Sequence, residues 1–286
     1  MLASIPQSPT VRLAYRIYVA LFFIYLAAPL LVVAVFAFNN SDFPGLPWVG
    51  FTLDWFFNDT EPKLGLIHDR RIVAGFGNSL WIAICVTTLS LTVATSTAFL
   101  FERHDFRFKE LAYLLMLAPL VIPGVLLGIS ILVFSSNLAN SADALWGIEI
   151  SALRPGTLLV VLGQFSFIAT IATLVIAARL RKLDIALEEA AFDLGASPAA
   201  VFRTITLPYL RPALVGAGIV AFLISFENFN TTLILNGSNA PLTVTMFDRM
   251  REGSTPVLNA VSLTLMLGSG LLGLIGVLVQ RDRSGR

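Results

Sequence analysis

The sequence contains unusually few charged residues. Asp, Glu, Lys and Arg make up 13% of its 286 residues, whereas 56% are hydrophobic. A soluble domain carries about 25% charged residues, so the chain lacks the surface charge that water on all sides would require. We therefore expect its surroundings to be mostly lipid. The net charge is only +1, which argues against the clustered basic face of a nucleic-acid-binding protein.

Residues that carry common chemistry are also scarce. The single cysteine, Cys85, lies in an apolar run, so a disulfide within the chain is impossible and a buried thiol is expected. The histidines, His68 and His104, have no ligand partners at metal-binding spacing. No G-x-x-x-x-G-K-[ST] phosphate loop is present. The pattern G-x-G-x-x-G occurs once, at residues 268–273, but inside an apolar run, where it indicates helix packing through small residues.

What the sequence does have is long apolar runs. Six runs have at least 18 mostly apolar residues with few or no charges, enough to cross a hydrocarbon core about 30 Å thick. The first is too long for a signal-peptide core and lacks a cleavage site, so we expect it to remain as an anchor. The expected fold is an all-α membrane protein with six transmembrane helices. The expected spans are Ile17–Phe38, Asn78–Phe101, Leu111–Phe134, Thr157–Ala178, Pro212–Leu235 and Val257–Gln280.

The positions of Lys and Arg predict the orientation of these spans, because cytoplasmic loops are enriched in both residues. With both termini in the cytoplasm, 13 of the 19 basic residues fall on the cytoplasmic side and 6 on the outer side. The loop between the fourth and fifth spans is then cytoplasmic. We expect a multi-pass protein of the bacterial inner membrane with this orientation.

That cytoplasmic loop contains a polar, helical segment, EEAAFDLGASPAAVFRTITLPYL, at residues 188–210. Asp184 is a good N-cap for a first short helix, and Gly195 supplies the left-handed residue that ends it. Ser197 and Pro198 then predict a second short helix, which Pro208 and Pro212 are expected to stop before the fifth span. The first helix has a narrow apolar stripe formed by Leu187, Ala190, Ala191 and Leu194.

Two interpretations of this segment are open from physics alone: an amphipathic helix at the membrane surface, or a helix that docks on another protein. Helices at the membrane surface favour Lys and Arg on their polar face, whereas this one carries Glu188, Glu189 and Asp193. The small face of Ala190 and Ala191 also suits a protein groove.

The segment resembles the EAA loop of the permease subunits of ABC importers, the binding-protein-dependent inner-membrane component family. Glu189-Ala190-Ala191 is followed by three residues, Gly195, nine residues and Ile205-Thr206-Leu207-Pro208, as in that loop. The resemblance extends over about residues 73–280. It includes Asn78-Ser79-Leu80, Pro119, Pro123, Gly124 and Gly128.

This resemblance implies a type I (MetI-like) permease fold whose cytoplasmic coupling helix fits a cleft on a separate ATPase. It implies three parts: an N-terminal span and outer loop (1–72), a transport core (73–280) and a short tail (281–286). The implied partners are a second homologous permease, an ABC ATPase dimer, a periplasmic solute-binding protein and membrane lipid. ATP and Mg would be used by the ATPase, and this chain would bind no cofactor. The implied coupling residues are Glu188, Glu189, Ala190, Ala191, Asp193, Gly195, Ser197, Pro198, Ile205, Leu207 and Pro208.

Glu227 is the one Asp, Glu, Lys, Arg or His within an expected span, where burying a charge costs about 2.5–3.5 kcal/mol. It is predicted to lie in the outer half of the membrane and to contact a solute, with an internal salt bridge as the structural alternative. Pro119 and Pro123 are expected to bend the third span. Further candidates for the substrate path are Phe226, Asn228, Phe229, Asn230, Gln164 and Phe165.

The solute is predicted to be a polyamine or a similar organic cation, because aromatic faces beside one carboxylate suit an ammonium on an alkyl stem. The first outer loop also resembles that of spermidine/putrescine permeases, and its aromatic residues suit a headgroup surface or a partner. Another solute, such as iron, an anion or a sugar, is the alternative. An ion-coupled transporter would show an inverted repeat, and a membrane enzyme would need a catalytic set.

Reporter fusions test the predicted topology. Fusions after Arg181 and Arg283 should report the cytoplasm, and fusions after Asp59, Ala142 and Gly253 should report the outer side, because the basic residues orient the spans. A cytoplasmic signal from the Asp59 fusion would overturn the six-span arrangement.

Overall fold

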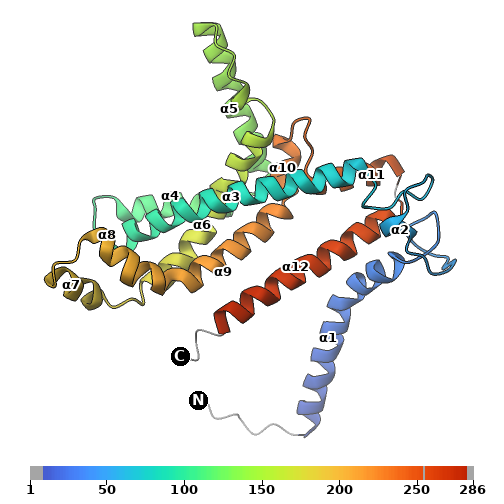
Figure 1. Cartoon of the computed structure of the whole chain (residues 1–286), viewed down its shortest axis with the longest axis horizontal. Helices are drawn as coiled ribbons and strands as arrows, with labels where there is room; N and C mark the ends of the chain where they lie inside the picture. Colours follow the sequence, from blue (N-terminus) through green and yellow to red (C-terminus); the bar gives the residue numbers. More distant parts are fainter. Residues whose placement is uncertain (1–8, 254, 282–286) are drawn as a thin grey trace. The chain divides into compact units, whose positions relative to one another are not determined.

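The computed structural model describes residues 9–253 and 255–281, which are mostly helical and contain no β-strand beyond a single bridge between Asn39 and Phe51. The predicted all-α fold is confirmed (Figure 1). The α-helices are α1 (Pro9–Phe36), α2 (Asp54–Phe57), α3 (Arg70–Arg103), α4 (Lys109–Val121), α5 (Gly124–Trp146), α6 (Thr157–Leu180), α7 (Ile185–Asp193), α8 (Pro198–Val201), α9 (Leu207–Phe226), α10 (Asn230–Leu235), α11 (Leu242–Gly253) and α12 (Val257–Arg281), with a 3₁₀ turn at Ser151–Leu153 and a π-helical turn at Phe202–Thr206.

Six helical segments are long and apolar enough to cross a membrane, as the sequence predicts. The chain is therefore a multi-pass membrane protein. The six segments are Pro9–Phe36, Arg70–Arg103, Gly124–Trp146, Thr157–Leu180, Pro198–Phe226 and Val257–Leu278. The predicted bounds of the third and fifth spans, however, are wrong.

The third span is broken where a bend was expected. Helix α4 ends at Val121, Ile122 has an extended backbone, and Pro123 occupies the N-cap position of α5. A residue that precedes proline is disfavoured in the helical region, and proline has no N–H to donate. Pro119 lies within the last turn of α4. The helix long enough to span is consequently α5.

The fifth span begins earlier and ends earlier than predicted. Pro208 and Pro212 do not stop the preceding short helix: α8 continues through the π-helical turn into α9, so Pro198–Phe226 is one helical segment. In that turn the Leu207 N–H donates to the Phe202 carbonyl, five residues back. The wider turn accommodates the ring of Pro208. Helix α9 then ends at Phe226, and α10 is a separate helix.

Two compact units make up the described chain. The first comprises the residues up to Arg70 together with Arg249–Leu267. It contains α1, which has no buried residue, and a long loop held by ion pairing of Arg249 with Asp69. The division into 1–72, 73–280 and 281–286 remains a prediction, and 282–286 lie outside the described residues.

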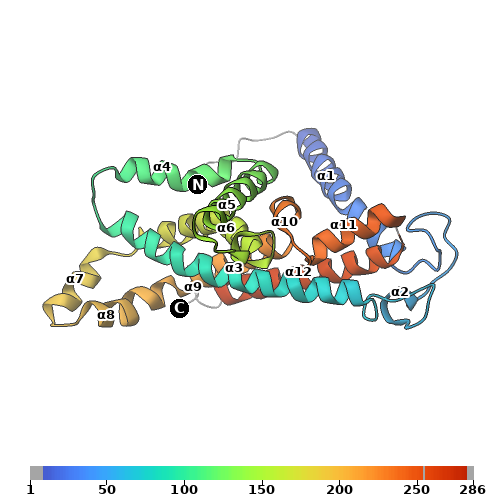
Figure 2. The same cartoon turned by 90° about the horizontal axis from the view of Figure 1, so that it is seen from above.

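The second unit comprises Arg71–Asp248 and the chain from Gly268 onward. Helix α6 lies at its centre and packs against α4, α9 and α10, while α5 packs against α10 (Figure 2). Apolar side chains of α3, α6 and α9 form two buried clusters along this contact. The first includes Ala94, Ile176, Leu180 and Leu210, and the second includes Ile82, Val86, Val160, Ile168 and Ala221.

Candidate functional site

The cytoplasmic loop predicted from the sequence forms two helices joined at a sharp turn. The Asp184 carboxylate accepts a hydrogen bond from the Ala186 N–H at 3.0 Å and caps α7. Gly195 has φ +83°, and the Ala196 N–H returns to the Ala191 carbonyl at 3.0 Å. This is the Schellman arrangement that ends a helix with a left-handed residue. Ser197 then caps α8. The predicted left-handed backbone of Gly195, which forms the elbow between α7 and α8, is confirmed.

One face of α7 is apolar and uncovered. Leu194 is 89% exposed and Leu187 54% exposed, and Ala190 and Glu189 are also exposed. Figures 1 and 2 show α7 and α8 at one end of the second unit, away from α10. An exposed face with large apolar side chains at the end of a spanning bundle is suited to docking on a protein surface.

Glu188 points the other way and ties α7 to the bundle. Its carboxylate pairs with Arg103 at the end of α3, with 3.0 Å between Oε2 and Nε, and both side chains are only 13% exposed. The Thr206 hydroxyl, in the π-helical turn before α9, donates to Glu188 Oε1 at 2.7 Å. The sequence marks Glu188 as an acidic residue of the first short helix but does not identify either partner, because both are distant in the chain.

Two arginines at the end of α6 complete this attachment. Arg181 donates to both carboxylate oxygens of Glu102 at 3.0 and 2.6 Å, and this hydrogen bonding raises the pKa of Arg181. The guanidinium of Arg179 lies 4.1 Å from the ring centroid of Tyr209 on α9. In the loop between α3 and α4, the ammonium of Lys109 lowers the pKa of Asp105 through a hydrogen bond. The ends of α3, α6 and α9 are therefore joined by charged groups.

Glu227 lies at the end of α9 and not within a helix. It occupies the C-cap position, its side chain is exposed, and it forms no ion pair within residues 9–253 and 255–281. The neighbouring rings belong to Phe226, which contacts Phe76 at 5.6 Å between centroids, and Phe229, which contacts Phe247 at 5.0 Å. The carboxylate is thus held at a helix break between two packed aromatic residues.

A buried chain of hydrogen bonds supports this break. Ser225, before the break, donates to the carbonyl oxygen of Gln164, and the Gln164 amide donates to the Thr232 hydroxyl at 2.8 Å. Thr232 in turn donates to Asn228 Oδ1 at 2.9 Å. Thr243 donates to the Asn228 carbonyl at 3.0 Å. Gln164 is 1% exposed, so its amide forms its hydrogen bonds inside the protein, and its place in a substrate path remains a prediction.

Close helix contacts hold α10 from two sides. A Cβ on Gly128 of α5 would lie 3.1 Å from Ile234 Cβ, and a Cβ on Gly163 of α6 would lie 2.3 Å from Leu235 Cδ1. Small residues allow such close backbone approach in membranes. The Thr231 hydroxyl also donates to the Gly124 carbonyl at 3.2 Å, next to the break at Pro123. The two helix breaks therefore lie against each other.

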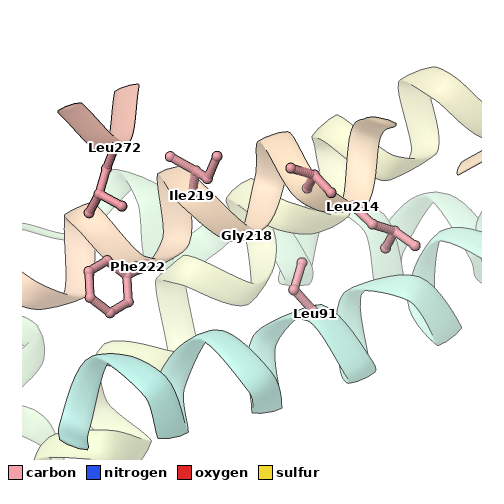
Figure 3. Close-up of a pocket in the computed structure, with 7 residues that line it drawn as sticks. Leu91, Leu214, Gly218, Ile219, Phe222 and Leu272 are labelled. Atoms are coloured by element: carbon pink, nitrogen blue, oxygen red, sulfur yellow. The ribbon is translucent and has the colours of Figure 1, made fainter. Parts of the chain in front are cut away.

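An apolar cavity of about 460 Å³ lies between α3, α9 and α12 of the second unit. Figure 3 shows its lining side chains, all carbon, with no group that would bind an ion or a polar solute. It is lined by Leu91, Leu214, Val215, Gly218, Ile219, Phe222 and Leu272. Among the residues that the structure describes, no cluster of His, Cys, Asp or Glu could hold a metal ion.

The remaining candidates are dispersed. Of the coupling residues, Asp193 and Pro198 are exposed, whereas Ile205, Leu207 and Pro208 are half-buried against the bundle. Of the path residues, Asn230 is exposed and Phe165 is half-buried. The break brings Phe226, Asn228 and Phe229 together around Glu227. Sequence reasoning missed Ser225, Thr232 and Thr243, whose polar groups inside apolar runs were the available signal.

Comparison with known proteins gives consistent results. Residues 90–281 match the family described as "binding-protein-dependent transport system inner membrane component". The chain is 33% identical to the putrescine transport system permease protein PotI of Escherichia coli K12, over 93% of this chain and 91% of that protein. It is 25% identical to the spermidine/putrescine transport system permease protein PotC of the same strain, covering 91% of each. It shares its fold with a bacterial ABC transporter involved in the import of alginate, with a TM-score of 0.76, 15% identity and 96% coverage of both chains.

Replacing the hub of the hydrogen-bond chain tests its contribution. Gln164→Leu should destabilise the protein by about 1–3 kcal/mol, because it leaves the buried Ser225 hydroxyl without its acceptor and removes the hydrogen bond that the Thr232 hydroxyl accepts. The measurement is thermal unfolding of the purified complex. In the double variant with Ser225→Ala, the loss should be smaller than the sum of the two single losses. If the two losses of stability simply add, the hydrogen bonds of Ser225 and Thr232 with Gln164 do not act as a unit.

Proposed function

Because this chain belongs to the family of binding-protein-dependent transport system inner membrane components, and so is a permease subunit of an ABC importer, we propose that it forms the translocation path for a polyamine or a similar organic cation. The relatives named as putrescine and spermidine/putrescine permeases support this solute class. The chain is a transport subunit and not an enzyme; in this family a separate subunit hydrolyses ATP.

The observation that carries the solute class is the exposed, unpaired carboxylate of Glu227 at the break after α9. A carboxylate at membrane depth is tolerable where water reaches it or where a cation neutralises it. The rings of Phe226 and Phe229 beside it offer faces to an ammonium on an alkyl stem. A single acid attracts a polycation without trapping it, and a path must release what it admits. Selective binding then belongs to the periplasmic solute-binding protein.

The uncovered face of α7 is the proposed contact with the ATPase dimer. Its exposed Leu187, Ala190 and Leu194 offer apolar surface, and Glu189 offers a charge at the rim. Glu188 is already engaged by Arg103 and Thr206, so it connects the docked helix to the bundle. A second homologous permease completes the membrane part of the importer, which lies in the bacterial inner membrane with both termini in the cytoplasm.

The turn at Gly195 provides a test of this contact. Gly195→Val places a branched side chain at a left-handed position, which costs about 1–2 kcal/mol. It should therefore redirect α8 and uncouple ATP hydrolysis from uptake while the protein stays in the membrane. ATPase activity and solute uptake are measured in vesicles that contain the complete complex. Ala199→Val, at an ordinary helical position in α8, is the matched control. If the Gly195→Val variant supports ATP-driven uptake at the normal rate, the turn at Gly195 is not needed for coupling.

The role of Glu227 is tested by removing its charge. Glu227→Gln keeps the size and hydrogen bonding of the side chain, so it should slow uptake of labelled putrescine or spermidine by several-fold without affecting assembly. Glu149→Gln, at an exposed position outside the spans, is the matched control. Equal rates for wild type and Glu227→Gln in vesicles with matched protein amounts would contradict the cation assignment, even though the chain would remain an importer permease.

A further inference from the structure

The loop that follows α1 carries an uncharged stretch of large exposed side chains. Residues 43–51, FPGLPWVGF, contain no Asp, Glu, Lys or Arg. Five of their side chains are between 47% and 79% exposed, although the residues are large and apolar. These are Phe43, Leu46, Trp48, Val49 and Phe51. A contiguous apolar surface of this kind on a soluble face would be an association site or a membrane contact.

Asn39 keeps this stretch from folding inward. Its fully buried side chain donates to the carbonyls of Gly45 and Pro47 at 3.0 and 3.1 Å and accepts from the Val49 N–H at 2.9 Å. The indole of Trp55 donates to the Asn39 carbonyl at 2.8 Å. The backbone of the loop is thus pinned from inside, so its apolar side chains remain on the outer surface.

Two attachments within the first unit fix the depth of the loop. From Arg16 to Phe36, α1 advances about 30 Å, the thickness of a hydrocarbon core, so its C-terminal end reaches the membrane boundary. The loop begins immediately after this end. Asn259, in the first turn of the spanning helix α12, donates to the Pro44 carbonyl at 3.3 Å. The loop therefore lies at the level where both helices meet the boundary.

We propose that residues 43–51 form an interfacial anchor, which inserts its aromatic and aliphatic side chains into the headgroup region of the bilayer beside α1. Helix α1 has no buried residue, and the anchor follows its end after six residues, of which only Asp42 is charged. Trp and other amphipathic rings are favoured at this depth. The anchor would hold the outer end of α1 at a constant height.

Nitroxide labels measure the depth directly. In a Cys85→Ala background, which removes the one native thiol, single labels are placed by Val49→Cys, Glu61→Cys and Leu26→Cys. The complete complex is reconstituted in nanodiscs of phosphatidylcholine and phosphatidylglycerol. The Val49 label should be several-fold more accessible to oxygen and less accessible to a water-soluble nickel chelate than the label at exposed Glu61. The Leu26 label, on exposed mid-helix α1, marks the deep reference.

The alternatives give different results. If the label at Val49 matches that at Glu61 in access to the nickel chelate, the anchor does not insert. If Val49 becomes protected only when the purified solute-binding protein is added, the surface docks that protein and the proposal is wrong. A label introduced by Leu46→Cys repeats the measurement at a second position of the anchor, so that poor folding of one variant does not decide the outcome.

Discussion

In the hydrocarbon core no water is available to bond a free backbone N–H or carbonyl, so a membrane helix can be interrupted only where the protein supplies the missing partners. Polar side chains lie at both helix breaks of this chain. At the break before Pro123, the Thr231 hydroxyl bonds the Gly124 carbonyl. At the break after Phe226, the Asn228 side-chain oxygen accepts a hydrogen bond from the Thr232 hydroxyl. The Asn228 backbone carbonyl accepts one from the Thr243 hydroxyl.

Because these two breaks lie against each other, they are not independent. Helix α10 begins at one break and packs against α5, which begins at the other. Gly128 and Gly163 allow α10 to sit close to its neighbours, and Gln164 fastens its first turns to the end of α9. A shift of α10 would have to break hydrogen bonds in a place where water could not replace them. The position of Glu227 is accordingly set by packing within the protein.

The sequence predicted the elements but not the helix breaks or their partners. Apolar runs identify spans because length and composition suffice, and Asp184, Gly195 and Ser197 mark the coupling segment because caps and left-handed turns are local. The contacts of Glu188 with Arg103 and of Gln164 with Thr232 join positions far apart in the chain, so no local pattern contains them. The helix ends predicted from the prolines were wrong because proline has two possible effects. A helix can continue past a proline by widening one turn, as at Pro208, or it can end at one, as before Pro123.

The continuity of the helix through Pro208 has a mechanical consequence for the proposed coupling. If Pro208 and Pro212 ended a short helix, a flexible joint would separate the coupling segment from the span. Instead Pro198–Phe226 is one helical segment that runs from the elbow at Gly195 to Glu227. Glu188 bonds Thr206 in the π-helical turn of that same segment. A displacement of α7 would therefore act on a continuous helical segment whose far end carries the carboxylate, with no loop between its two ends.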